Sequence, residues 1–320
     1  MVHLELNTSR YFTKRIKNHP TPDDITSISV PHGSLVSIHI LSKLKNLEKL
    51  YIGRNRIKDL TPLKNLVNLR ELHLFGNRIE NLKPLGNLVN LKVLKLTDNR
   101  IDDVQPLSNL LSLERLYLSS NEIVNLRPLK NLVNLKELYL ANNEIIDLEP
   151  LANLSNLRQL YLAYNYIEDL EPLKNLVNLH ILHVERLEIK NLLPLSGLVN
   201  LEVLYLTKCG IEYLEPLSKL RNLRQLYLGG NNIKDVRPLS NLINLNTLSL
   251  IGNKFCDYRP LANLWNIRHI HTPYDICESY KTILKEIHIS RRQRTLLECT
   301  LPRNYRCPFN NLREFGILGL

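Results

Sequence analysis

The chain has 320 residues, of which 70 are leucine, and its 42 Lys and Arg against 31 Asp and Glu give a formal charge of +11. No stretch approaches the roughly 20 consecutive apolar residues of a membrane-spanning helix, so we expect a soluble chain whose leucines follow a pattern. The basic excess is spread thinly, with one cluster at Arg291, Arg292 and Arg294. Nucleic-acid binding is therefore not expected, because it calls for basic residues gathered on one face.

Residues 1–24 are polar apart from a few apolar side chains, and we interpret them as a small N-terminal cap. Such a cap covers the apolar core that the first coil of a repeat protein would otherwise expose. The N-terminus lacks the charged start and the unbroken apolar segment of a secretory signal. We therefore expect an intracellular protein, cytoplasmic or nuclear, or one in the host cytosol if its source is a virus or an effector-secreting bacterium.

Leucine recurs every 22 residues from Leu47 to Leu245, and Ile25 and Ile267 extend the series. Residues 25–266 thus form eleven units of 22 residues with no insertion or deletion. A typical unit reads LKELYLANNEIIDLEPLANLSN, with apolar residues at unit positions 1, 4, 6, 11, 14, 17 and 20, Asn at 9 and 22, and Pro at 16. A single unit cannot bury seven apolar side chains alone, so this period indicates a solenoid of stacked coils.

Each unit position predicts a local structure. Apolar positions 4 and 6 alternate with positions 3, 5 and 7, which is the pattern of a strand with one buried face. The Asn amide at position 9 is expected to bond backbone groups that the non-helical coil leaves unpaired. Proline at position 16 fixes φ and lacks an N–H donor, so it favours the start of a short turn over a full helix.

The Asn series is interrupted in two consecutive units, where Leu187 and Cys209 occupy position 9, and Tyr213 replaces the usual Asp or Asn at position 13. Two interpretations stay open from the sequence. The first is local drift packed into the core, and the second is an irregularity near a partner site.

Residues 267–320 are interpreted as a C-terminal cap, with a twelfth strand beginning at Ile267 and a helix of about twenty residues after the capping residue Asp275. The region at and after the last repeat holds Cys256, Cys277, Cys299 and Cys307. Their spacing suits neither a zinc knuckle nor closely paired disulfides, so buried free thiols in a reducing compartment are expected. No metal or cofactor is expected.

The repeat resembles that of the leucine-rich repeat family in its 22-residue class, across 242 of the 320 residues. The Pro-Leu pair in LEPLANLSN is similar to bacterial internalins, and the Leu-Tyr-Leu strand is similar to the leucine-rich-repeat regulatory subunit of type-1 protein phosphatase. The resemblance implies an α/β solenoid: a right-handed horseshoe with a parallel concave β-sheet, short 3-10 turns on the convex side, and terminal caps. It also implies protein binding on the concave face.

Position 5, at the centre of each strand, supplies the candidate partner-binding residues. Tyrosine dominates this position, and it is favoured at interfaces because it buries a large area at small rotamer cost. The candidates are Tyr51, His73, Lys95, Tyr117, Tyr139, Tyr161, His183, Tyr205 and Tyr227. The alternative is that these rings only cover the sheet and pack on one another. Charges of alternating sign at positions 2, 3 and 8 are expected to pair laterally between units.

The sequence contains no phosphate loop, metal-ligand pair or nucleophile elbow, so no enzymatic activity is expected. It predicts a monomeric, non-enzymatic scaffold that binds a protein of unknown identity on its concave face. One version of this hypothesis is a regulatory role like that of the phosphatase subunit. The alternative is an internalin-like surface or secreted adhesin or effector.

Overall fold

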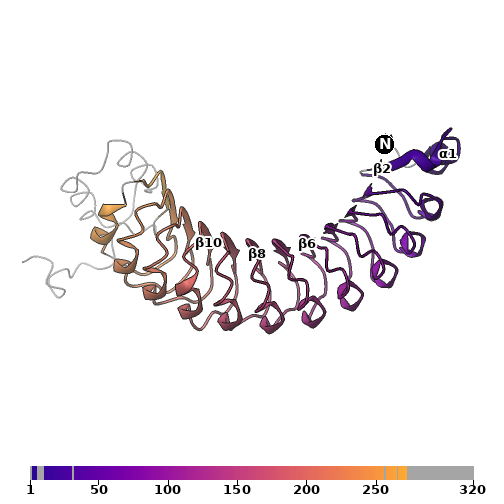
Figure 1. Cartoon of the computed structure of the whole chain (residues 1–320). Helices are drawn as coiled ribbons and strands as arrows, with labels where there is room; N and C mark the ends of the chain where they lie inside the picture. The colour runs from indigo at the N-terminus through magenta and orange to yellow at the C-terminus, as the bar shows by residue number, and fades with distance from the viewer. Residues whose placement is uncertain (1, 6–10, 31, 256, 265, 272–320) are drawn as a thin grey trace, which may run out of the picture.

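The computed structural model describes residues 2–5, 11–30, 32–255, 257–264 and 266–271 (Figure 1). The helix expected after Asp275 and the four cysteines from Cys256 onward lie outside these described residues. The division of the chain at residues 24 and 266 stays a prediction.

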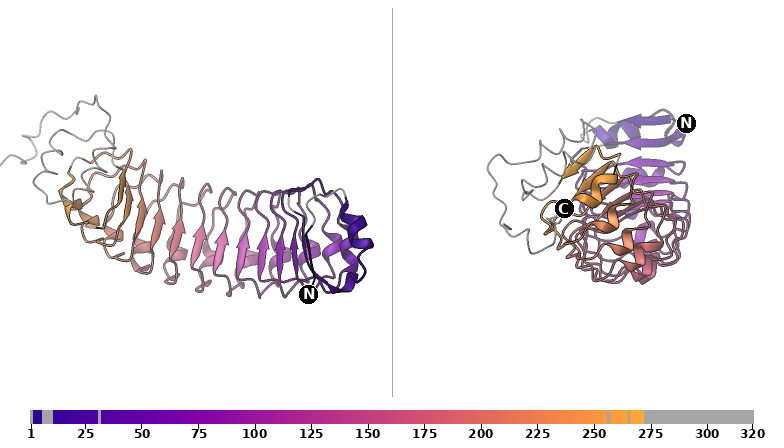
Figure 2. Two further views of the ribbon diagram at one scale, coloured as in Figure 1. Left: turned by 90° about the horizontal axis from the view of Figure 1, so that it is seen from above. Right: turned by 90° about the vertical axis from the view of Figure 1, so that its left-hand side faces the viewer.

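The described strands form one parallel sheet in which spatial order follows chain order. The sheet lines the concave side of a curved solenoid, and Figure 2 shows its strands side by side along the long axis. The strands are β1 Val2–Glu5, β2 Ile25–Ser29, β3 Lys49–Tyr51, β4 Glu71–His73, β5 Val93–Lys95, β6 Arg115–Tyr117, β7 Glu137–Tyr139, β8 Gln159–Tyr161, β9 Ile181–His183, β10 Val203–Tyr205, β11 Gln225–Tyr227, β12 Thr247–Ser249 and β13 His269–His271. The parallel concave sheet implied by the family resemblance is confirmed.

Short 3-10 turns occupy the convex side, as expected from the prolines at position 16. In ten of these turns a proline stands at the first or second residue, where the missing N–H costs no hydrogen bond. The convex turns are η3 His39–Lys43, η4 Thr61–Leu63, η5 Lys83–Leu85, η6 Gln105–Leu107, η7 Arg127–Leu129, η8 Glu149–Leu151, η9 Glu171–Leu173, η10 Leu193–Gly197, η11 Glu215–Leu217, η12 Arg237–Leu239 and η13 Arg259–Asn263. Among the described residues, no helix is long and apolar enough to cross a bilayer.

The N-terminal segment adds one strand and two short helices before the first repeat strand. Strand β1 pairs with β2 in parallel, with Leu4 opposite Ile28. Helix α1 (Phe12–Lys17) buries Phe12 and Ile16 against the core, and η2 (Pro22–Asp24) leads into β2. Phe12 and Ile16 thereby join the apolar core.

One continuous core runs through the stacked coils. The apolar positions of the typical unit, among them Leu138, Leu140 and Ile145, are fully buried. Each leucine packs on its equivalents in the coils before and after it, so the core is shared by all coils.

The asparagine at position 9 joins each coil to the one before it. In Asn143, the Nδ2 group donates to the carbonyl oxygens of Leu118 and Leu140, both at 3.0 Å, and Oδ1 accepts from the Ile123 N–H at 3.1 Å. The same pattern recurs at Asn55, Asn77, Asn99, Asn121, Asn165, Asn231 and Asn253. The expected backbone role of these amides is confirmed.

The two coils without asparagine at position 9 make different contacts at that position. Leu187 and Cys209 are both buried, and the Cys209 thiol donates to the Val184 carbonyl oxygen at 3.1 Å. Burial raises the pKa of the Cys209 thiol to about 11, so it stays protonated at neutral pH. Asn231 Oδ1 accepts from two N–H groups, those of Cys209 and Ile211. Both replacements are therefore part of the core.

Candidate protein-binding site on the concave face

All nine predicted site residues lie in one row on the concave sheet. Each is the last residue of its strand, from Tyr51 in β3 to Tyr227 in β11, and not the central residue that the sequence predicted. The strand register sets equivalent residues side by side, for example Tyr117 beside Tyr139 and Tyr139 beside Tyr161. We call this row the tyrosine ladder, comprising Tyr51, His73, Lys95, Tyr117, Tyr139, Tyr161, His183, Tyr205 and Tyr227.

Neighbouring rings of the ladder stack on one another. The ring centroids of Tyr117 and Tyr139 are 4.4 Å apart, and those of Tyr139 and Tyr161 are 4.3 Å apart with planes only 9° from parallel. Tyr205 and Tyr227 stack in the same way at 4.4 Å. Adjacent strands of a sheet lie about 4.8 Å apart, so the parallel sheet itself holds equivalent rings near stacking distance.

The ladder continues through its non-tyrosine members. Lys95 Nζ lies 4.9 Å from the centroid of the Tyr117 ring, a cation–π distance. His183 makes an edge contact with Tyr161 at 5.8 Å and a tilted contact with Tyr205 at 4.5 Å. From Lys95 to Tyr227 the side chains therefore form one unbroken series of contacts.

Position 3 side chains fix the tyrosine hydroxyls. The Tyr117 hydroxyl donates to Glu137 Oε2 at 2.7 Å, and the Tyr139 hydroxyl bonds Gln159 Oε1 at 3.0 Å. Stacking and hydrogen bonding together order these rings before any partner arrives, which lowers the entropy cost of binding. The rings do pack on one another, as the covering interpretation expected, yet they remain partly exposed to solvent.

Burial shifts the ionisation of the ladder tyrosines. It raises the pKa of Tyr51 and of Tyr117 to about 12, and hydrogen bonds to Glu71 and Glu137 respectively act in the same direction. The pKa values of Tyr139 and Tyr205 are also raised, mainly by burial.

These shifts predict a loss of stability at alkaline pH. A tyrosine in the unfolded chain ionises near its ordinary pKa of 10.0, whereas the folded chain keeps Tyr51 and Tyr117 protonated up to about 12. Their contribution to stability is therefore complete below pH 10 and is lost as pH rises from 10 towards 12. We expect the tyrosinate absorbance of the native chain to rise at higher pH than that of the denatured chain. Coincident titration curves would contradict the partial burial of these rings.

Charge is unevenly distributed along the concave sheet. Strands β3 to β7 carry charged residues at positions 3 and 5, such as Lys49, Arg115 and Glu137. In β8 to β12 the same positions hold no Lys, Arg, Asp or Glu, and Ile181 and Val203 are only partly buried there. The ladder thus has a charged N-terminal half and a more apolar C-terminal half.

Charged residues at position 2 pair between coils, as the sequence predicted. Among the described residues, those at positions 3 and 8 form no ion pair with a neighbouring coil, so the prediction was wrong for these two positions. Glu114 contacts Lys92 at 3.6 Å and Lys136 at 2.7 Å. Further along the sheet, Arg224 contacts Glu202 at 3.5 Å. These exposed pairs each contribute little stability, but they keep the rim beside the ladder electrically balanced.

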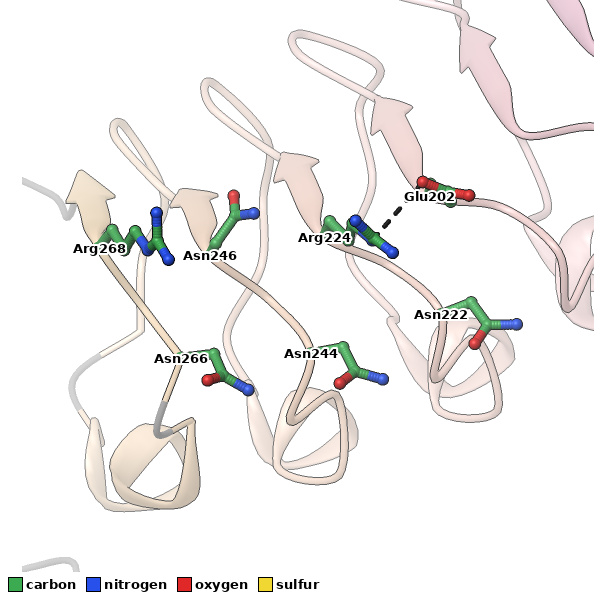
Figure 3. A pocket seen from close by; sticks show the side chains of 7 residues that line it. All are labelled: Glu202, Asn222, Arg224, Asn244, Asn246, Asn266 and Arg268. Atoms are coloured by element: carbon green, nitrogen blue, oxygen red, sulfur yellow. Dashed lines mark ion pairs between the residues drawn. The ribbon is translucent and has the colours of Figure 1, made fainter.

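A polar pocket of about 300 Å³ lies where the convex turns lead into strands β10 to β13 (Figure 3). It is lined by Glu202, Asn222, Arg224, Asn244, Asn246, Asn266 and Arg268. The amide groups of Asn222, Asn244 and Asn266 are used within the fold, because each donates to a carbonyl oxygen of the preceding coil. Sequence reasoning missed this pocket because its lining comes from two separate unit positions, 2 and 22.

The chain is thus a curved solenoid of strand-and-turn coils with an aromatic row on its concave sheet. The family described as Leucine Rich repeats (2 copies) matches residues 67–109, 111–153, 199–232 and 221–263. No curated protein sequence matched the chain.

Solved structures extend the similarity over most of the chain. An internalin of Listeria monocytogenes, InlF, is 31% identical over 78% of this chain and 81% of its own, with a TM-score of 0.71. Internalin C2 of the same organism is 40% identical over 58% of this chain and 82% of its own, with a TM-score of 0.56. The plant peptide hormone receptor RGFR1, solved in complex with RGF2, has a TM-score of 0.70 at 23% identity over 87% of this chain and 46% of its own, and shares the fold alone. The chain belongs to the leucine-rich repeat family.

Proposed function

We propose that the chain is a non-enzymatic, monomeric scaffold that binds a protein partner along its tyrosine ladder. The observation that carries this proposal is the continuous series of contacts from Lys95 to Tyr227. A pre-ordered aromatic row on an open sheet offers a partner large contact area with little ordering cost. Its hydroxyl groups and partly exposed ring edges can meet both polar and apolar groups.

The two halves of the ladder suggest what the partner presents. The N-terminal half offers charges of both signs, and the C-terminal half offers Tyr205, Tyr227, Ile181 and Val203 on an otherwise weakly charged surface. We infer a partner surface with a charged part and an aromatic or aliphatic part, the latter packing against β8 to β11. Apolar and aromatic contacts at the centre of an interface usually carry most of the binding energy.

Two settings for this binding are proposed. The first is an intracellular regulatory scaffold, in the manner of the phosphatase regulatory subunit. The second, an internalin-like surface or secreted adhesin or effector, is favoured by the similarity to InlF and internalin C2. Fractionation of the source cells with an antibody to the native protein separates the two, because only the second places the protein at the cell surface or in the medium.

Affinity capture followed by lysine cross-linking tests the binding face. Lys49 and Lys95 lie on the concave strands, whereas Lys64 and Lys130 follow the convex turns η4 and η7. We expect cross-links to the captured protein from Lys49 or Lys95. Links confined to Lys64 and Lys130 would place the partner on the opposite side and refute the proposal.

A further inference from the structure

A second column of side chains follows the strands, at unit position 10 on one edge of the solenoid. The backbone N–H of each residue donates to the position 11 carbonyl oxygen of the preceding coil, as from Arg78 to Ile57 and from Glu122 to Ile101, both at 2.9 Å. These bonds hold the side chains in register on successive coils, and all of them are exposed. We call this row the edge column, comprising Arg56, Arg78, Arg100, Glu122 and Glu144.

Like charges stand next to each other in the edge column. Arg56, Arg78, Glu122 and Glu144 form no ion pair with any described residue, and Arg100 reaches only Glu80, at 3.8 Å. Neighbouring positions on adjacent coils are about 5 Å apart, where like charges destabilise a fold. Three arginines followed by two glutamates are therefore a self-repelling arrangement.

Charges elsewhere on the same edge are arranged in the opposite way. At unit position 12, Glu168 pairs with Lys190 in the next coil, and Glu212 pairs with Lys234 at 2.6 Å. Opposite charges can thus pair between neighbouring coils on this edge, but within each half of the edge column the neighbours have the same charge. A stability role does not account for the column.

The acidic half of the column is bordered by exposed apolar side chains. Val124 and Ile146 are 49% and 63% exposed at position 12. The coils on either side carry a charged residue at this position: Lys58, Glu80, Asp102, Glu168, Lys190, Glu212 and Lys234. Tyr166, 67% exposed, continues the column beyond Glu144. The two apolar residues at position 12 therefore lie in the same coils as the unpaired carboxylates of Glu122 and Glu144.

We propose that the edge column is a second contact surface, which takes a protein segment with an acidic stretch followed by a basic stretch containing apolar residues. The acidic stretch lies along Arg56, Arg78 and Arg100, and the basic stretch meets Glu122 and Glu144 beside Val124 and Ile146. Binding relieves the repulsion within both halves. Nucleic acid and anionic lipid do not fit, because the carboxylates would repel a continuous run of phosphates. This surface is separate from the tyrosine ladder and goes beyond the proposed function.

A pair of synthetic peptides tests the edge column on the purified full chain. One fluorescent peptide of about 12 residues, long enough when extended to span five coils, carries an aspartate block and then a lysine block with interspersed valines. The control peptide has the same composition with the charges alternating. By fluorescence anisotropy at low salt we expect the block peptide to bind about tenfold more tightly, with the preference decreasing as salt screens the charges. Equal binding of the two peptides would overturn the proposal.

A charge-neutral double variant, Arg78→Glu with Glu144→Lys, makes the edge column alternate in sign. We expect it to lose the preference for the block peptide and to unfold at a temperature no lower than the unmodified chain. The matched control, Arg127→Glu with Glu149→Lys on the convex turns, should keep the preference. A retained preference in the edge variant, or a lower unfolding temperature, would contradict the proposal. Replacing the ladder tyrosines should leave the peptide preference unchanged, which separates this test from that of the proposed function.

Discussion

Replacing Asn143 by alanine is expected to lower the free energy of unfolding by about 2–4 kcal/mol, although the side chain contributes nothing to the apolar core. The change removes the two hydrogen bonds donated to Leu118 and Leu140 and the one accepted from Ile123. It leaves the Ile123 N–H without its partner in a site that is 7% exposed, whereas the carbonyl oxygens of Leu118 and Leu140 each keep one donor, from Asn121 and Asn165 respectively. Each buried polar group left without a partner costs about 1–3 kcal/mol.

Urea unfolding of the purified chain measures this effect, with Asn153→Ala as the matched control. Asn153 is an exposed residue on the convex side and its side chain makes no hydrogen bond with any described residue. We expect its loss to change stability by less than about 0.5 kcal/mol. If the two variants unfolded at the same urea concentration, the asparagine series would not connect the coils as inferred.

The two interrupted coils fold without an asparagine at position 9. Leu187 and Cys209 occupy the unit position that Asn143 occupies in its own coil. In other coils the backbone N–H at position 10 donates to the preceding coil, as from Tyr166 to the Ile145 carbonyl oxygen. The N–H groups of Glu188 and Gly210 form no such bond. Burial of the Leu187 side chain offsets part of that loss, since a fully buried leucine contributes about 1.5–3 kcal/mol. An alanine at position 143 has no such compensation.

The second large effect is expected at the tyrosine ladder. Replacing Tyr139, Tyr161 and Tyr205 together by alanine should abolish partner binding while the chain stays folded. These rings lie on the concave surface outside the continuous core, so their loss removes contact area and stacking but no buried leucine contact. Truncation of aromatic residues at the centre of an interface typically costs 2 kcal/mol or more each, which would weaken binding by at least about 10³-fold.

Much of the fold could be predicted because its period is strict. Each leucine, proline and asparagine has a fixed place in a 22-residue unit, so identifying the unit places the strand, the turn and the buried amide together. The N-terminal strand β1 was not predicted, because four residues at a chain end carry too little pattern to be recognised as a strand. The two elements that follow it occur once and have no repeat to reveal them.

The candidate site was predictable as a row but not in its contacts. The sequence placed nine side chains in one line, yet ring stacking depends on side-chain rotamers, and His183 is tilted where its tyrosine neighbours lie parallel. The charges of the edge column are legible at position 10, but only the structure shows that Glu122 and Glu144 make no ion pair within the described chain. Pairing depends on distances between coils that a one-dimensional pattern does not specify.

Binding along the tyrosine ladder is tested by the dissociation constant of the captured partner, measured for three purified proteins. These are the unmodified chain, the Tyr139, Tyr161 and Tyr205 triple variant, and a control in which the exposed convex residues Val67, Val133 and Val177 are replaced by alanine. Circular dichroism establishes that all three are folded. Binding through the tyrosine ladder predicts that only the triple tyrosine variant loses affinity. Equal affinity of the tyrosine variant and the unmodified chain, or a loss confined to the convex variant, would contradict it.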